Sequence, residues 1–166
     1  MKLERSIPIC FITKYYQLTW SDCYLGLIES WLTLDDVIKY ALNKIECKTY
    51  SEDEFALASL YSYERDEALS ILEKLSKLDK NKSDSKTAWL KIILLWVFEK
   101  NPDVSSLQKY VESIYEDFSY PEEISHLIKY NVNLYDIDSG LSWECFFLNQ
   151  YIELLYEWFG YEKKLV

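Results

Sequence analysis

The longest uninterrupted apolar stretch lies near the middle of the chain. Residues 88–100 read AWLKIILLWVFEK, and no polar side chain occurs between Lys91 and Glu99. The seven apolar residues in between would cover every side of a helix, which is typical of a helix buried all round or lying in a membrane. Seven residues with charges at both ends are too few for a bilayer, which takes about 20. The pattern therefore predicts a buried central helix with other helices packed around it.

Further helices are predicted by apolar residues spaced three and four apart, each set preceded by a polar residue. Such polar side chains can accept the free backbone N–H groups of a first helical turn. The expected cap residues are Thr19, Thr33, Ser51, Asp84 or Ser85, and Asp103. The segments expected to be helical, besides the central one, are residues 20–31, 34–45, 52–61, 64–78, 104–118, 122–128 and 141–159.

Two of these segments carry more specific expectations. Residues 119–122 read SYPE, and we expect Ser119 to cap a helix whose first turn contains Pro121. The segment 141–159 is followed by Gly160, which is typical of a helix end. Its buried face is expected to consist of apolar residues at steps of four and three: Leu141, Cys145, Leu148, Ile152, Leu155 and Phe159.

The spacing of these segments predicts the architecture. Short loops make successive helices antiparallel neighbours, and Gly26 inside an expected helix indicates close packing against another helix. Residues 7–18 fit either a helix or a short edge strand, and we favour the helix. We predict an all-α single domain (1–166): about eight helices in a compact antiparallel stack of helical hairpins around the buried helix 88–100. A helical solenoid is the alternative, but no repeat period holds through three units.

The charge balance narrows the range of partners. The chain has 28 Asp and Glu against 18 Lys and Arg, a net charge of −10. This balance argues against nucleic acid, whose binding depends on cations that neutralise phosphates, and against anionic membrane surfaces. It favours a basic protein partner, because opposite fields steer two proteins together. A role of the charge in solubility alone is the alternative.

The cysteines and the first residues indicate a reducing compartment. Cys10, Cys23, Cys47 and Cys145 are separated by 13, 24 and 98 residues, which matches no zinc or redox spacing. Each has apolar neighbours, so we expect four small buried side chains. The apolar run at residues 7–12 is short, contains a proline and is not typical of a signal peptide. We therefore expect a cytoplasmic protein.

No motif in the chain indicates catalysis. His126 is the one histidine, and no set of partner residues accompanies it in the sequence. Most paired carboxylates precede expected helices, where capping and the helix dipole explain them, whereas Glu116 and Asp117 stand at a helix C-terminus, where acids are unfavourable. Residues 136–140 (DIDSG) resemble only part of a calcium loop. We expect no catalytic residue, no metal ligand and no cofactor, and therefore no enzyme.

Charge is segregated along the chain. Residues 51–67, 111–128 and 130–162 carry net charges of −5, −5 and −6, whereas residues 73–91 carry +3. Tyrosines are interleaved with the acids, and tyrosine is enriched in protein interfaces; the alternative is that these tyrosines close the core with their hydroxyls at the surface. The residues expected to bind a partner are Tyr63, Glu64, Asp66, Glu116, Asp117, Tyr120, Glu122, Glu123, Tyr135, Asp136 and Asp138.

Several segments together resemble a small bacterial family known only as a domain of unknown function. The resemblance covers roughly residues 15–130. The segments that carry it are Thr19-Trp20-Ser21-Asp22 with Gly26, residues 34–41 (LDDVIKYA), 54–60, 69–75, Trp89-Leu90, residues 114–118 (IYEDF) and residues 120–124 (YPEEI). Such small acidic bacterial proteins are similar to immunity proteins encoded beside contact-dependent or polymorphic toxins.

The resemblance implies a cytoplasmic immunity protein that binds and neutralises the C-terminal domain of a cognate, basic toxin by protein–protein contact. It supplies no catalytic residues. A helical adaptor for another cellular protein is the first alternative, and a metal-dependent enzyme with clustered carboxylates is the second. Neither nucleic acid nor a membrane is expected as a partner, and the oligomeric state is left open.

Overall fold

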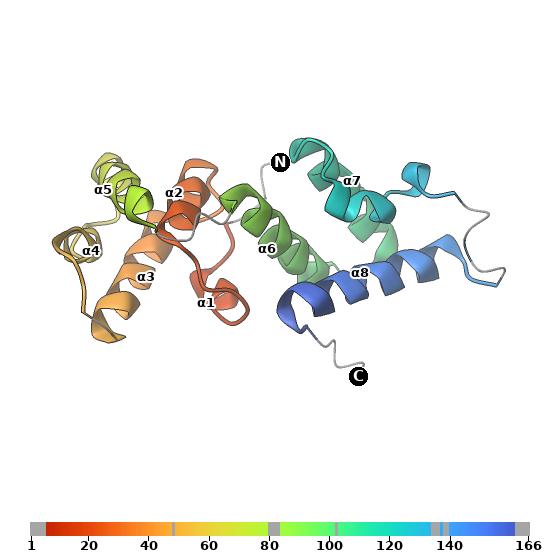
Figure 1. Ribbon diagram of the computed structural model, residues 1–166, viewed down its shortest axis with the longest axis horizontal. Helices are drawn as coiled ribbons and strands as arrows, with labels where there is room; N and C mark the ends of the chain where they lie inside the picture. Colours follow the sequence, from red (N-terminus) through yellow and green to blue (C-terminus); the bar gives the residue numbers. More distant parts are fainter. Residues whose placement is uncertain are drawn as a thin grey trace. The chain divides into compact units, whose positions relative to one another are not determined.

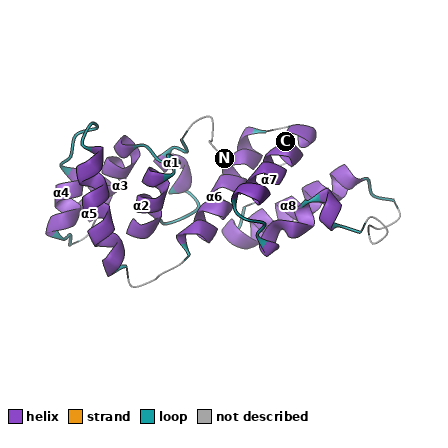
Figure 2. Ribbon diagram, turned by 90° about the horizontal axis from the view of Figure 1, so that it is seen from above, coloured by secondary structure: helices purple, strands orange, loops and turns teal. Residues whose placement is uncertain are grey.

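The fold is all-α, as the spacing of apolar residues predicts. The computed structural model describes residues 6–47, 49–79, 84–101, 103–133, 137 and 140–161. Helices and loops make up this part of the chain, and no strand occurs in it (Figures 1 and 2). Backbone contacts divide the chain into two compact units, residues 2–89 and 90–166, and the boundary falls inside α6 (Ser85–Lys100). The single domain stays a prediction.

In the unit of residues 2–89, three helices begin where the sequence places caps: α2, α3 and α4. Its elements are α1 (Ile9–Ile12), α2 (Trp20–Ile28), α3 (Leu34–Cys47), α4 (Glu52–Ala58), α5 (Arg65–Leu78) and the first residues of α6. Thr19 and Ser51 each form a capping box with an acid three residues later. At Thr33, the hydroxyl oxygen accepts the backbone N–H of Asp36 at 3.1 Å. These polar side chains satisfy N–H groups that the first turn leaves free.

The helices of this unit pack in pairs, and the pairs are not all consecutive in the sequence. α3 packs against α4, α4 against α5, and α2 against α5 (Figure 1). α1 is a helix, as favoured over a strand, but it ends at Ile12, far short of residue 18. Its first backbone N–H, that of Ile9, donates to the carboxylate of Asp36 on α3 at 3.2 Å. The short α1 is therefore held to α3 by a polar contact at its N-terminus.

Gly26 marks a close approach of α2 and α6. A Cβ atom at Gly26 would lie 2.3 Å from Cζ2 of Trp89, so the indole of α6 lies directly on the backbone of α2. The indole N–H of Trp89 donates to the main-chain oxygen of Asp22 at 2.8 Å, and its ring packs 5.2 Å from that of Trp31. The close approach that the glycine indicates is therefore confirmed, and Trp89 is the partner.

The unit of residues 90–166 contains the rest of the central helix. Its elements are the remainder of α6, then α7 (Val104–Asp117), the 3₁₀ helices η1 (Glu122–Leu127) and η2 (Lys129–Asn131), and α8 (Trp143–Phe159). Every residue from Ile92 to Phe98 is buried except Trp96, which is half-buried. The hydroxyl of Tyr151 on α8 donates to the main-chain oxygen of Leu94 at 2.8 Å. The predicted burial of the central helix is confirmed.

The buried face of α8 differs from the predicted one. The buried residues are Trp143, Phe147, Tyr151 and Leu155, at constant steps of four. Of the expected face only Leu155 is buried, and Leu141 and Cys145 are exposed. Because α8 is apolar on several sides, its spacing fits two faces. The face with the large aromatic rings is buried, since these rings remove the most apolar area from water.

Two expectations about single side chains are wrong. Cys10 and Cys145 are exposed, and only Cys23 is buried, while the side chain of Cys47 lies outside the described residues. Ser119 caps no helix, because the segment after it is a 3₁₀ helix whose N-cap position is Pro121. Proline lacks a side-chain acceptor, so the first turn of η1 has no side-chain cap.

Replacement of Gly26 by alanine tests the packing of Trp89. We expect Gly26→Ala to lower the free energy of unfolding by about 1–3 kcal/mol, because overpacking outweighs the better helix propensity of alanine. Gly140→Ala is the matched control, since no atom lies within 4 Å of a Cβ built there. Urea unfolding of both variants measures the difference. Stabilisation by Gly26→Ala would show that α2 and Trp89 are not in close contact.

Three buried weak acids predict a loss of stability in alkali. Burial raises the pKa values of the Cys23 thiol and of the Tyr40 and Tyr151 hydroxyls above their ordinary values. In the unfolded chain these groups lose protons near pH values of about 8.5 and about 10, whereas the folded chain keeps them. The unfolded state then binds fewer protons, so the free energy of unfolding falls as pH rises through this window.

We expect the free energy of unfolding to decrease between about pH 8 and about pH 11. Cys23 and Tyr151 should each contribute a slope of up to about 1.4 kcal/mol per pH unit once the group has ionised in the unfolded chain. Tyr151→Phe should flatten the profile above about pH 10, and the exposed Tyr156→Phe should leave it unchanged. Equal profiles for wild type and Tyr151→Phe would contradict the burial of this hydroxyl.

Candidate functional site

The end of α7 is shaped by a serine in a conformation that glycine usually adopts. Ser119 has φ 63°, its N–H donates to the main-chain oxygen of Glu116 at 3.0 Å, and the N–H of Tyr120 donates to that of Tyr115 at 2.8 Å. These two bonds form a Schellman motif, whose left-handed position favours glycine. The helix therefore ends sharply and presents Tyr120 directly after its last turn.

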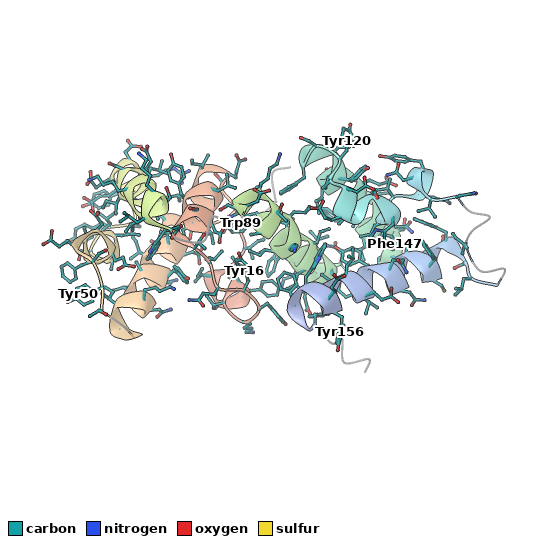
Figure 3. All side chains as sticks on the ribbon, viewed as in Figure 1. Tyr16, Tyr50, Trp89, Tyr120, Phe147 and Tyr156 are labelled. Atoms are coloured by element: carbon teal, nitrogen blue, oxygen red, sulfur yellow. The ribbon has the colours of Figure 1, made fainter. Side chains whose placement is uncertain are left out.

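The ring of Tyr120 packs against a buried tyrosine, Tyr115. The two rings meet edge to face, with centroids 5.3 Å apart, which is the apolar contact that often accompanies this motif. Tyr115 is buried, and its hydroxyl accepts the side-chain N–H of Asn131 at 3.0 Å. Tyr120 is 61% exposed, and Figure 3 shows it at the end of α7. The inner ring is thus anchored while the outer ring faces solvent.

Tyr130 of η2 joins the same region. Its pKa is raised, first by desolvation and then by the proximity of Tyr115, Glu116, Tyr120 and Glu112. Tyr130 is nevertheless an exposed side chain, as are both glutamates. The neighbouring Asn131 of η2 donates to Tyr115, on whose ring Tyr120 packs, so residues from α7, from the turn after it and from η2 lie close together. We call this set the Tyr120 surface: Glu112, Glu116, Tyr120 and Tyr130, supported from beneath by Tyr115.

The carboxylates of the Tyr120 surface destabilise the folded state. Glu112 and Glu116 lie four residues apart on α7, so two like charges share one helix face. Glu116 also lies in the last turn of α7, where the helix dipole is already negative. The charge of Lys129 acts on Glu144 instead. The pKa of Glu144 is lowered mainly by hydrogen bonds at the start of α8 and to a smaller extent by Lys129. Within the described residues, no ion pair joins Glu112 or Glu116 to a cation.

The other predicted residues of this unit are close to Glu116 and Tyr120 in the sequence or follow them in the loop before α8. Asp117 is the last residue of α7, and Glu122 and Glu123 begin η1; all three are exposed. Tyr135, Asp136 and Asp138 lie outside the described residues. The structure therefore brings Glu116 and Tyr120 together, and it adds Glu112 and Tyr130, which the sequence-based list omits.

The sequence holds a local signal for Glu112 but none for Tyr130, the two residues that the prediction omits. Glu112 precedes Glu116 by one helical turn, so the helical period alone could have placed both on one face. Tyr130 is separated from Tyr120 by η1, and no local period relates two residues across an irregular connection. Its placement depends on how η1 folds back on α7, which pack against each other.

The predicted residues Tyr63, Glu64 and Asp66 belong to the unit of residues 2–89. Tyr63 is 78% exposed and stacks on Tyr61, and Asp66 is exposed. Glu64 has a structural role, because its carboxylate accepts the backbone N–H of Tyr61 at 2.8 Å and closes the turn before α5. The predicted set is thus divided between two units, and each surface is considered by itself.

The lone histidine has a simple environment. His126 is half-buried on η1, and desolvation lowers its pKa while Glu153 of α8 acts in the opposite direction. Among the described residues, no three side chains of His, Cys, Asp or Glu are grouped as ligands of a metal ion would be. None of the described helices is both long and apolar enough to cross a lipid bilayer.

The geometry defines an all-α chain with acidic, tyrosine-bearing surfaces. The chain belongs to the bacterial family DUF2247, described as an uncharacterized protein conserved in bacteria, whose sequence model matches residues 9–135. This match confirms the resemblance to a bacterial family of unknown function and includes α1 through η2, and with them the Tyr120 surface. No curated protein and no solved structure shows significant similarity to the chain.

Substitution by glycine should change the stability in opposite directions at two serines, Ser119 after the end of α7 and Ser113 inside this helix. Ser119→Gly should raise the free energy of unfolding by up to about 1 kcal/mol, because a left-handed conformation costs other residues roughly 1–2 kcal/mol and glycine little. Ser113→Gly, inside α7, should lower the free energy of unfolding by about 0.5–1 kcal/mol. Thermal unfolding compares the two. A loss of stability in Ser119→Gly would argue against the Schellman end of α7.

Proposed function

We propose that this protein is an immunity protein, which binds a basic bacterial toxin domain through the Tyr120 surface and neutralises it. The observation that carries the proposal is the convergence of Glu112, Glu116, Tyr120 and Tyr130 on one exposed region without a compensating cation among the described residues. Membership of a bacterial family agrees with a bacterial role. Resemblance to small acidic immunity proteins supplies the toxin as the kind of partner.

The chemistry of this surface suits a basic protein. Tyrosine offers a rigid ring with a polar tip and loses little conformational entropy when it is covered. The carboxylates between the rings attract cations and steer the encounter. A toxin domain that acts on nucleic acid must present lysines and arginines to phosphates. An acidic surface that occupies these cations blocks the approach of the substrate, which is a sufficient mechanism of neutralisation.

Two rival functions make different predictions about the partner. A helical adaptor would use the same surface for a cellular protein that is harmless when produced alone. A metal-dependent enzyme would bind magnesium, manganese or calcium, and calorimetric titration of the folded protein with each ion detects this. A heat of binding with a defined stoichiometry would favour the enzyme over both binding roles.

The first experiment is capture of partners from the native host with the tagged protein in low salt, followed by mass spectrometry and a toxicity assay. We expect a basic bacterial protein at one-to-one stoichiometry that arrests growth when expressed alone and permits growth when co-expressed with this chain. Capture of a harmless partner at the same stoichiometry would replace the immunity role with the adaptor role.

Charge reversal at one position tests the surface itself. Glu116→Lys should slow association with the captured partner roughly three- to tenfold in low salt, because it removes part of the steering field. The same substitution should raise the free energy of unfolding by about 0.3–1 kcal/mol, because a cation in the last turn complements the helix dipole. Loss of binding together with a gain in stability separates a binding role from a structural one.

The matched control is Glu46→Lys. Glu46 is exposed and is the next-to-last residue of α3, as Glu116 is of α7, so both substitutions change the net charge and a helix end alike. We expect Glu46→Lys to gain similar stability while its association rate stays close to that of the wild type. Equal association rates for the two variants, measured by stopped-flow fluorescence, would remove the Tyr120 surface from the proposal.

A further inference from the structure

In the unit of residues 2–89, exposed aromatic side chains concentrate around the short helix α4. They flank or belong to α4, and Figure 3 labels Tyr50 just before this helix. They form two stacked pairs, Tyr50 with Phe55 at 5.9 Å and Tyr61 with Tyr63 at 5.6 Å between ring centroids. The exposed fractions of Tyr50, Phe55, Tyr61 and Tyr63 are 55%, 54%, 65% and 78%.

These rings do not serve to close the core. The buried residues of α4 are Leu57 and Ala58, so the core side of the helix is occupied by other side chains. Phe55 has no polar tip, and its exposure leaves apolar area in water with no gain to the fold. Exposed apolar patches of this kind mark surfaces that bind other molecules. The alternative that tyrosines here close the core with their hydroxyls outward therefore fails at Tyr61 and Tyr63.

The charge beside the Tyr61–Tyr63 pair is negative. Residues 51–67 contain six acids and one arginine. That arginine, Arg65, donates a guanidinium N–H to the main-chain oxygen of Leu27. Asp66 and Glu67, in the first turn of α5, are exposed and form no ion pair with a described residue. The segment that carries the two rings is therefore acidic, and its exposed carboxylates attract cations.

The ring faces of this pair also suit a cation. The two rings are parallel within 2°, so they present flat outer faces. Within the described residues, no lysine or arginine lies over either ring. Elsewhere the chain covers aromatic rings with its own lysines: Lys44 over Tyr40 at 5.2 Å, Lys91 over Trp158 at 5.1 Å and Lys100 over Trp96 at 4.7 Å.

We propose that the Tyr61–Tyr63 pair, with Asp66 and Glu67, is a docking surface for an arginine-bearing segment of a partner protein. A guanidinium is planar, stacks on an aromatic face and can pair a carboxylate with two parallel N–H groups. An ammonium is a compact, strongly hydrated charge and uses the flat face less well. The inference is independent of toxin neutralisation, because it concerns a separate set of residues and the chemistry of one side chain.

The experiment compares hexa-arginine with hexalysine peptides, titrated in low salt into the ¹⁵N-labelled full-length protein. Both peptides carry the same charge, so attraction to an acidic protein is matched. We expect the arginine peptide to bind more tightly and to cause its largest amide shifts within residues 61–67. Equal affinity of the two peptides, or largest shifts outside this segment, would overturn the proposal.

Variants assign the preference to the rings. Tyr61→Ala/Tyr63→Ala should weaken arginine-peptide binding by about five- to tenfold, since two exposed cation–π contacts are lost, and should bring it to the level of the lysine peptide. Tyr61→Phe/Tyr63→Phe keeps both ring faces and should keep the preference. Loss of the preference in the phenylalanine variant, with the fold intact by its amide spectrum, would overturn the role of the ring faces.

Two controls separate this surface from other acidic regions. Tyr120→Ala/Tyr130→Ala removes the exposed rings of the Tyr120 surface and should leave the arginine preference unchanged. Asp66→Asn/Glu67→Gln should weaken binding of both peptides to a similar extent, because it removes charge and leaves the rings. Loss of the preference in the Tyr120→Ala/Tyr130→Ala variant would move the arginine site to the Tyr120 surface and overturn this inference.

Discussion

Burial of the apolar residues of α6, which cover all sides of the helix, is the constraint on which the rest of the structure depends. In the unit of residues 2–89, the indole of Trp89 lies against Gly26 and donates to the main-chain oxygen of Asp22. In the unit of residues 90–166, Leu94 accepts the hydroxyl of Tyr151, and Phe98 packs on the ring of the same tyrosine. One helix thus supplies the core of two sets of neighbours, because its apolar residues cover all its sides.

The end of α7 carries two features that lower the stability of the fold. A serine occupies a left-handed position that favours glycine, and Glu116 lies at the negative end of the helix dipole. Each feature costs free energy, and at Ser119 the two Schellman hydrogen bonds and the contact of Tyr120 with Tyr115 offset part of this cost. Departures from local preference of this kind are expected mainly at functional or strained sites. Tyr61 and Tyr63 are a second case, since their rings stay in water.

The parts of the fold that depend on neighbours in sequence were predictable. Thr19 and Ser51 cap their helices because the acceptor and the free N–H lie three residues apart. Burial of the central helix follows from seven apolar residues in a row, whatever surrounds it. Within the Tyr120 surface, Glu116 and Tyr120 could be named for the same reason: both stand at one helix end, and Glu112 follows from the helical period.

Tertiary packing decided what local patterns leave open. The apolar residues of α8 fit two faces, and the aromatic face of Phe147 is buried because its rings bring more apolar area to α6 and its neighbours. Tyr130 reaches the Tyr120 surface only because η1 packs back on α7. By itself, the sequence determined where the capped α-helices begin, which helix is buried and how charge is distributed. Which faces meet was decided by the structure, since contact depends on area and shape gathered from distant segments.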